Sequence, residues 1–159
     1  MAGALSEGSS EQPSAGEIRA FAYRLLGRRE YSVFELDQRI RRKWPQLEPS
    51  AASDLLDALV NENLLSDQRF TESYVRILMQ KQQGPLKIRA SLRARGVPDG
   101  LISPELDRHS DRWVDLATEW LQRQHPGPLD FDDRKKYYRR LANRGFSHDQ
   151  AMDAVNSMS

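Results

Sequence analysis

The sequence contains no cysteine, and this absence excludes several classes of protein together. Without cysteine there is no disulfide framework, no zinc ribbon and no cysteine nucleophile. The absence of thiols fits the reducing cytoplasm, where we expect this protein to be located. The sequence also has no apolar run close to the roughly 18 residues that a membrane-spanning helix requires, so we expect no association with a membrane.

Motifs that would indicate catalysis or nucleotide binding are missing as well. There is no G-x-x-x-x-G-K-[ST] phosphate loop and no G-x-G-x-x-G motif. The three histidines, His109, His125 and His148, lie in separate connections without a partner at metal-ligand spacing. The adjacent carboxylates Asp132 and Asp133 favour a helix N-terminus over a magnesium site. We therefore predict a protein that is not an enzyme and that needs no metal or other cofactor.

The composition is that of a folded, polar chain. Its 159 residues suffice for one domain or a short array of small units, and 38% of them are hydrophobic. Residues 1–16 are rich in Gly, Ser, Pro and Glu and lack the basic and apolar regions of a secretory signal. We predict a disordered N-terminal tail over 1–16.

Apolar residues recur with helical spacing along nearly the whole chain. Intervals of three and four residues produce an amphipathic stripe in two segments in particular: Ile18, Phe21, Ala22, Leu25 and Leu26, and then Trp113, Leu116, Ala117, Trp120 and Leu121. No stretch alternates between apolar and polar residues as a strand would. The spacing predicts an all-α fold.

Capping residues mark where these helices begin. Ser32 with Glu35, and Ser147 with Gln150, have the spacing of capping boxes, in which each side chain satisfies a free backbone donor of the first turn. Two prolines suit the first turn of a helix, where no backbone N–H is needed: Pro85 and Pro98.

Two helix ends indicate an internal repeat. Gly96 followed by Val97, and Gly145 followed by Phe146, are typical of left-handed helix ends that favour glycine. A shift of 49 residues superposes these ends and four further apolar positions, and a looser shift of 52 residues adds an earlier copy. Leucine-rich helices align with themselves by chance, but chance does not match the glycines. We predict three three-helix repeats at 17–65, 66–109 and 110–159.

Positive charge is concentrated on two segments, although the net charge is only +1. Residues 76–95 hold six basic residues and no acidic one, and residues 134–144 hold six more, again with no acid. A weaker cluster, at 39–43, occupies the same place in the first copy. We expect these clusters to lie on the second helix of each repeat.

The acid-free surroundings predict that these cations have few partners within the chain, which leaves them available to an anionic partner. DNA phosphates and an acidic protein surface would serve equally, and a solvated helix face would produce the same pattern. The candidate partner-binding residues are Lys87, Arg89, Arg93, Arg95, Lys135, Lys136, Arg139, Arg140 and Arg144.

Residues 65–75, LSDQRFTESYV, resemble LDDxRFAxxYV, the hallmark of the RecX family, with Ser66 and Thr71 as departures. Residues 84–97 resemble its GxxKIxxxLxxxGI segment. Residues 22–36 match its opening pattern of Ala-x-x-Leu-Leu, an Arg-rich turn and Ser-x-x-Glu-Leu. The resemblance covers about residues 17–157, which is all but the tail.

The resemblance implies an elongated, curved array of three tandem three-helix repeats. It also implies a regulator in homologous recombination, DNA repair and the SOS response. Such a protein binds RecA filaments in their deep helical groove and inhibits ATP hydrolysis, filament growth and strand exchange. The resemblance does not determine whether the protein also contacts DNA, within the filament or outside it. We expect a monomer, because terminal repeats can bury their own apolar faces.

The hallmark residues have a simpler explanation than partner binding. Phe70, Tyr74 and Val75 share an apolar stripe and are expected in the core, while Asp67 and Arg69 suit a local cap and ion pair. Two other functions stay open. One is a helical DNA-binding protein with a single recognition helix, and the other is a repeat scaffold for an acidic protein.

Overall fold

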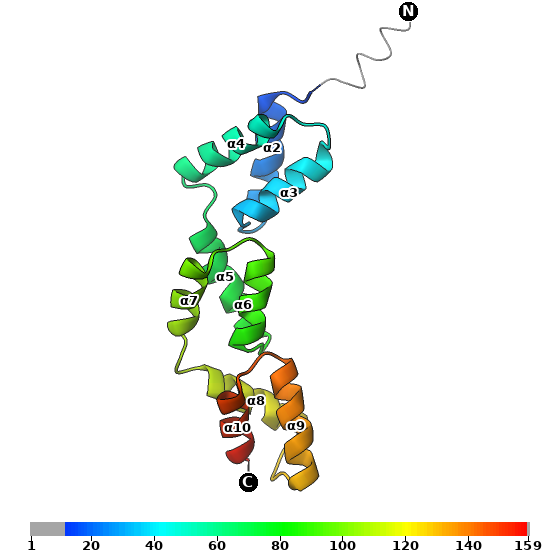
Figure 1. Cartoon of the computed structure of the whole chain (residues 1–159), viewed down its shortest axis with the longest axis vertical. Coiled ribbons are helices and arrows are strands. Elements are labelled where there is room, and N and C mark those ends of the chain that lie inside the picture. Colours follow the sequence, from blue (N-terminus) through cyan, green and yellow to red (C-terminus); the bar gives the residue numbers. More distant parts are fainter. Residues whose placement is uncertain (1–11, 159) are drawn as a thin grey trace, which may run out of the picture. The chain divides into compact units, whose positions relative to one another are not determined.

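The computed structural model describes residues 12–158, and within this range the chain forms nine helices and no strand (Figure 1). The all-α prediction is confirmed. No helix in this range is long and apolar enough to cross a membrane. In chain order the helices are α2 (Ala15–Leu26), α3 (Val33–Lys43), α4 (Pro49–Asn61), α5 (Asp67–Gln80), α6 (Pro85–Ala94), α7 (Asp99–Asp107), α8 (Trp113–Gln124), α9 (Phe131–Asn143) and α10 (His148–Asn156).

The described residues form two compact units, which divide within α5 after Phe70. The first unit holds α2, α3 and α4, and the second holds most of α5 and all helices from α6 to α10. The division into three repeats stays a prediction.

The first helix begins earlier than the sequence suggested. Residues 1–11 of the expected tail lie outside the described residues, but α2 already starts at Ala15. The hydroxyl of Ser14 accepts a hydrogen bond from the backbone N–H of Glu17 at 3.1 Å, so this serine is the N-cap. The side chain of Gln12 bonds the backbone of the α3–α4 connection, at the oxygen of Gln46. The disordered tail was therefore predicted too long.

The first unit has its core between three helices. Leu36, Ile40 and Leu59 are fully buried there, and Phe21 meets Trp44 edge to face. The capping box of Ser32 and Glu35 is confirmed at the start of α3. The apolar stripe of α2 therefore packs as its spacing predicts.

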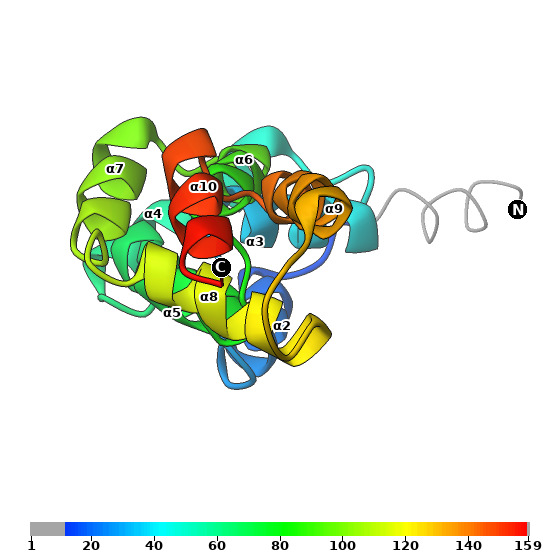
Figure 2. The same cartoon turned by 90° about the horizontal axis from the view of Figure 1, so that it is seen from below.

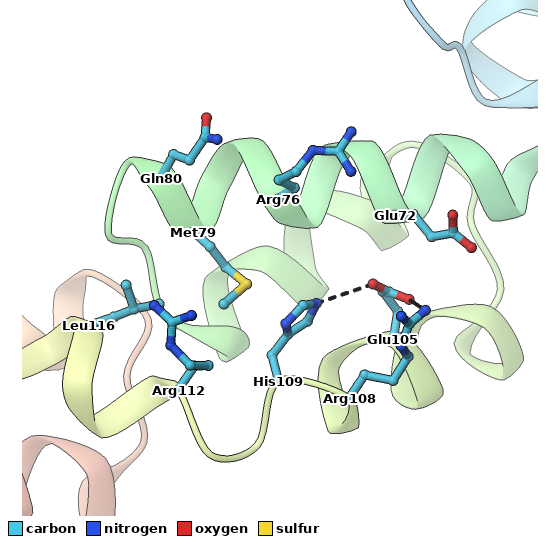
Figure 3. A pocket seen from close by; sticks show the side chains of 9 residues that line it. All are labelled: Glu72, Arg76, Met79, Gln80, Glu105, Arg108, His109, Arg112 and Leu116. Atoms are coloured by element: carbon cyan, nitrogen blue, oxygen red, sulfur yellow. Dashed lines mark hydrogen bonds and ion pairs between the residues drawn. The ribbon is translucent and has the colours of Figure 1, made fainter.

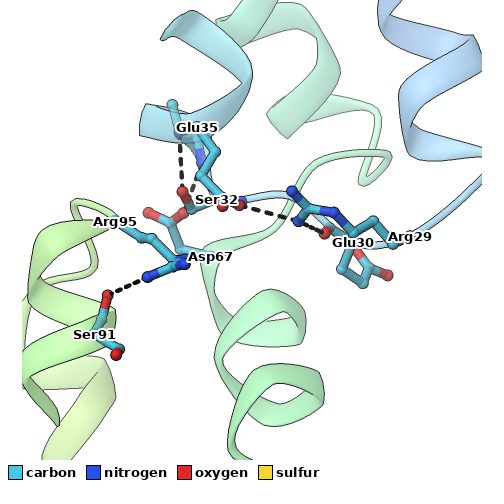
Figure 4. Close-up of polar contacts among 8 residues, drawn as sticks. Arg29, Glu30, Ser32, Glu35, Asp67, Ser91 and Arg95 are labelled. Atoms are coloured by element: carbon cyan, nitrogen blue, oxygen red, sulfur yellow. Dashed lines mark hydrogen bonds and ion pairs between the residues drawn. The ribbon is translucent and has the colours of Figure 1, made fainter. Parts of the chain in front are cut away.

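The hallmark carboxylate and guanidinium at the start of α5 reach back to the α2–α3 connection of the first unit. Asp67 accepts a hydrogen bond from the backbone N–H of Val33 at 2.9 Å, at the N-terminus of α3, where negative charge is favourable. Arg69 pairs with Glu30 at 3.0 Å. Figure 4 shows Asp67 beside Ser32 and Glu35. The local cap and ion pair expected from the sequence did not anticipate these two contacts, which join residues more than thirty positions apart.

The other hallmark residues are structural. Phe70 and Val75 are buried, with 2% and 0% of their surface exposed, as expected for core positions. Tyr74 is only half-buried, and the guanidinium of Arg95 lies over its ring at 4.8 Å. These residues stabilise the fold and present no open contact surface.

Helix starts in the second unit follow the sequence closely. The capping box of Ser147 and Gln150 is confirmed, and Pro85 is the first residue of α6. Pro98 precedes α7 as its N-cap instead of lying in its first turn. A third capping box joins Asp130 to Asp133, so this carboxylate caps α9, in agreement with the helix N-terminus expected there.

The two predicted left-handed helix ends are confirmed. Gly96 has φ 75° and Gly145 has φ 97°. The next residue in each case donates its N–H to a carbonyl five residues back, Val97 to Leu92 at 3.1 Å and Phe146 to Leu141 at 3.2 Å. These bonds satisfy carbonyls of the last turn, and Val97 and Phe146 are both buried.

A contact between two glycines joins the end of α9 to the start of α6. Gly84 donates its N–H to the carbonyl of Arg144 at 2.7 Å, and Leu86 donates to that of Gly145 at 2.9 Å. A Cβ on Gly145 would lie 2.3 Å from the Cβ of Lys87, and one on Gly84 would lie 2.3 Å from the carbonyl carbon of Gly145. Neither position has room for a side chain. In Figure 1 the α9–α10 turn accordingly lies against the N-terminal end of α6.

We predict that Gly145→Val lowers the free energy of unfolding by more than about 2 kcal/mol, because it adds a steric clash with α6 to the cost of a left-handed turn. Gly96→Val is expected to cost about 1–2 kcal/mol from its φ. Urea unfolding followed by circular dichroism measures both.

Gly100→Ala serves as the control, because Gly100 lies inside α7 with no atom within 4 Å of an added Cβ. It is expected to raise stability by about 0.5 kcal/mol. Equal losses for Gly100→Ala and Gly145→Val would contradict the role assigned to the glycine contact.

Candidate partner-binding surface

The nine candidate residues all lie in the second unit, on α6, on α9 and at the C-terminal ends of these two helices. Arg76 and Lys81, which belong to the same acid-free segment, lie instead on α5 and in the turn that follows it. The glycine contact places the C-terminal end of α9 against the N-terminal end of α6. The two basic helices therefore meet end to end, and Figure 2 shows them from the C-terminal side.

Two of the three cations of α6, Arg89 and Arg93, have partners within the chain, whereas Lys87 is exposed and forms no ion pair in the described range. Arg93 donates two hydrogen bonds to the carboxylate of Asp99, at 2.8 and 3.0 Å. Arg89 donates to the hydroxyl of Ser103 at 2.8 Å and lies 3.6 Å from Asp99. The expectation of few internal partners is wrong here, because the turn at Gly96 brings the first turn of α7 back beside α6. Chiefly through its hydrogen bond, Arg93 holds the pKa of Asp99 below its usual range.

Arg95 and Arg144 hold turns together. Arg95 donates to the carbonyl of Ser91 at 3.0 Å, the contact drawn in Figure 4. Arg144 donates to the carbonyls of Gln82 and Lys81, at 3.1 and 2.6 Å, and its guanidinium lies 5.2 Å from the Trp120 ring centre. Burial lowers the pKa of Arg144. Both arginines therefore have a structural role in this unit.

Four of the five cations of α9, all but the half-buried Arg134, are exposed and differ from Arg89 and Arg93 of α6. Within residues 12–158 none of these four forms an ion pair with a carboxylate. Lys135 lies over the ring of Phe131, and Lys136 and Arg140 lie over that of Tyr137. Positions 135 and 139, like 136 and 140, are one turn apart and share a helix flank. These side chains, Lys135, Lys136, Arg139 and Arg140, together with the exposed Lys87 of α6, are the part of the predicted surface that lacks a carboxylate partner in the described range.

A hollow of about 490 Å³ between α9 and α10 borders two of these cations, Lys135 and Arg139. Its apolar lining comes from Phe131, Tyr138, Met152 and Val155. The hydroxyl of Tyr138 is hydrogen-bonded to Nδ1 of His148 at 2.7 Å. The sequence analysis missed this hollow, since it needs two helices packed together. The phenylalanine beside the basic run was the available signal.

A second hollow, of about 370 Å³, lies between α5, α7 and the start of α8 (Figure 3). Its buried carboxylate, Glu105, accepts a hydrogen bond from Arg108 and contacts Nε2 of His109, both at 3.2 Å. The carboxylate is thus satisfied by the same helix end. No group of three or more His, Asp or Glu side chains in the described range could hold a metal ion.

We predict that Arg93→Gln raises the pKa of Asp99 towards its ordinary value, because the hydrogen bonds that stabilise the carboxylate are lost. Carboxyl-carbon NMR titration measures this. Lys87→Gln, on the same helix, is the control and should leave the value unchanged.

The same pair makes a pH-dependent contribution to stability. Because the pKa of Asp99 is lower in the folded chain, this contribution is present above the unfolded pKa and is lost as pH falls through the folded value. Arg93→Gln should therefore flatten the acid limb of the stability curve. An unchanged pKa for Asp99 would show that the pair does not persist in solution.

Comparison with known proteins finds relatives over nearly the whole chain. The family model described as RecX, second three-helix domain, matches residues 66–103. The regulatory protein RecX of Chromohalobacter salexigens is 42% identical over 135 residues, covering 84% of this chain and 88% of the relative. That of Halorhodospira halophila is 36% identical over 149 residues, covering 92% and 91%.

Solved structures share the fold. The crystal structure of RecX from Lactobacillus salivarius superposes with a TM-score of 0.78 at 21% identity, covering 91% of this chain and 96% of that chain. A second crystal structure of a regulatory protein RecX has a TM-score of 0.77 at 18% identity and covers 97% of this chain and 77% of the other. At this identity the likeness concerns architecture alone.

Proposed function

Because the chain belongs to the RecX family of regulatory proteins, we propose that it binds the RecA recombinase filament in its helical groove and inhibits it. Binding there would reduce ATP hydrolysis, filament extension and DNA strand exchange. The identity of the partner rests on the motif resemblance at residues 65–75 and 84–97. The proposal locates the protein in the cytoplasm and requires no cofactor.

The observation that carries the proposal is the set of four exposed cations on α9 that lack carboxylate partners in the described part of the chain. A partner with carboxylates or phosphates would neutralise them, steering association and fixing orientation. The proposed mechanism is binding alone. A filament repeats one protomer, so a protein that bridges neighbouring protomers would resist the rearrangements that accompany ATP hydrolysis.

The same cations would also serve a helical DNA-binding protein, which is the competing hypothesis. Such a protein would present one isolated recognition helix. Here the basic residues occur on two helices that meet end to end, and Arg89 and Arg93 of α6 are already paired with α7. This distribution favours a protein surface as the partner.

We predict that reversing Lys135, Arg139 and Arg140 to Glu raises the concentration needed for half-inhibition of RecA ATPase by at least about tenfold, while the fold is kept. Inhibition by the wild-type chain should itself weaken with added salt. Reversing Lys87, Arg89 and Arg93 is a less clean test, because it sets new carboxylates beside Asp99.

The matched control reverses three exposed arginines outside the candidate surface, Arg24, Arg28 and Arg112. It changes the net charge equally, and full inhibition is expected. Circular dichroism checks folding in each variant. If the folded α9 variant inhibits RecA at the same concentrations as the wild-type chain, its cations are a solvated helix face and do not contact the partner. Retained RecA inhibition with lost binding to bare DNA would separate the two partners.

A further inference from the structure

The hollow between α9 and α10 becomes informative when it is compared with the equivalent place in the preceding repeat. The shift of 49 residues maps Arg89, Asp99 and Ser103 onto Tyr138, His148 and Met152. Between α6 and α7 those side chains are tied together by the hydrogen bond from Arg89 to Ser103 and by the ion pairs with Asp99. Between α9 and α10 one tyrosine–histidine hydrogen bond takes their place, and the hollow is open.

The cations also occupy different positions on α6 and on α9. Arg93, which pairs with Asp99, corresponds to Ala142, whereas Leu86 and Ala90 correspond to Lys135 and Arg139. Lys135 and Arg139 of α9 therefore lie on the border of the hollow without a carboxylate partner in the described range. A structural role accounts for Arg89 and Arg93 of α6 but not for Lys135 and Arg139.

An exposed aromatic side chain stands at the same place. Phe131 is the first residue of α9 and is 70% exposed. The ammonium group of Lys135 lies 4.4 Å from the centre of its ring. Together with Met152 and Val155 it lines a hollow whose volume of about 490 Å³ is in the range of ligand pockets. An apolar floor with a cationic border is the arrangement of a peptide-anchor site.

Exposed carboxylates on the same two helices favour a peptide over a nucleic acid as the ligand. Asp149 and Asp153 are exposed on α10, and Asp132 is exposed on the first turn of α9. A polynucleotide, which has a phosphate at every nucleotide, would meet these carboxylates as well as the cations. A short peptide can place acidic residues against Lys135 and Arg139 alone and insert an apolar side chain beside Met152.

We propose that the hollow between α9 and α10 binds an acidic peptide segment of a protein partner, anchored by one aromatic or aliphatic side chain. The inference deepens the proposed function and rests on it for the source of the segment, a protomer of the filament. The acidic residues of the segment would pair with Lys135 and Arg139, and its anchor would contact Phe131, Tyr138 and Met152.

The test uses the full chain and a fluorescent synthetic peptide of Asp, Glu and Ser with one central Phe. A second peptide has Ala in place of Phe, and a thymidine oligonucleotide supplies matched charge. The Phe peptide is expected to bind, and the Ala peptide at least about fivefold more weakly, because anchor side chains dominate such contacts. Methyl NMR of methionine should show Met152 shifting on binding while Met79, in the other hollow, stays unchanged.

Matched variants identify the site. Phe131→Ala and the double variant Lys135→Gln/Arg139→Gln should each weaken peptide binding by about fivefold or more. Phe34→Ala, at another exposed phenylalanine, and Lys43→Gln, at another lysine beside aromatic rings, should leave it unchanged. Circular dichroism confirms that each variant folds.

Equal affinity for the Phe and Ala peptides would contradict the role of an anchoring side chain. An unchanged methyl signal of Met152 in the presence of the Phe peptide would contradict the location of the binding site. The same holds if the oligonucleotide, and not the peptide, shifts Met152, since the hollow would then bind nucleic acid. RecA is absent from this assay, so its failure leaves inhibition of RecA ATPase standing. Conversely, retained peptide binding alongside absent RecA inhibition would contradict the proposed partner and not the site.

Discussion

The contact between Gly84 and Gly145 is the constraint on which the candidate surface depends. Two backbone hydrogen bonds fix the turn after α9 against the first turn of α6, at a separation that no Cβ would allow. Arg144 strengthens the junction by donating hydrogen bonds to the carbonyls of Lys81 and Gln82, in the turn between α5 and α6. The junction thereby sets the spacing between the cations of the two helices. These glycines act on the surface through the backbone.

The near-neutral net charge of the chain conceals two kinds of cation. Some are used within the fold: Arg69 pairs with Glu30, Arg93 with Asp99, and Arg144 bonds two carbonyls. Others, such as Lys135 and Arg139, have no carboxylate partner in the described range. Only the second kind offers charge to another molecule, since neutralising an already paired arginine gains little. Counting basic residues along a helix does not separate the two kinds.

What the sequence could predict follows from the distance over which each feature is determined. Helices, capping boxes and the left-handed turn at Gly145 depend on residues within one or two turns, and they were found. The contact of Asp67 with Val33 joins positions 34 residues apart, so an argument from neighbouring residues did not predict it. The pairing of Arg93 with Asp99 was within reach, because the predicted turn at Gly96 already folds α7 back beside α6.

The hollow beside α9 was beyond such reasoning, because it arises from a difference between the α6–α7 pair and the α9–α10 pair of helices. In the α6–α7 pair, Arg89, Asp99 and Ser103 are joined across the two helices. In the α9–α10 pair, the corresponding tyrosine, histidine and methionine leave apolar surface exposed to solvent. Exposed apolar area is unfavourable by about 25 cal/mol per Å². Polar side chains like those that join α6 to α7 could have closed the gap between α9 and α10. Comparison of the two helix pairs reveals that the α9–α10 hollow is open where its counterpart is closed. Since the exposed apolar surface of the hollow stabilises nothing within the fold, binding of another molecule is the physical explanation for it.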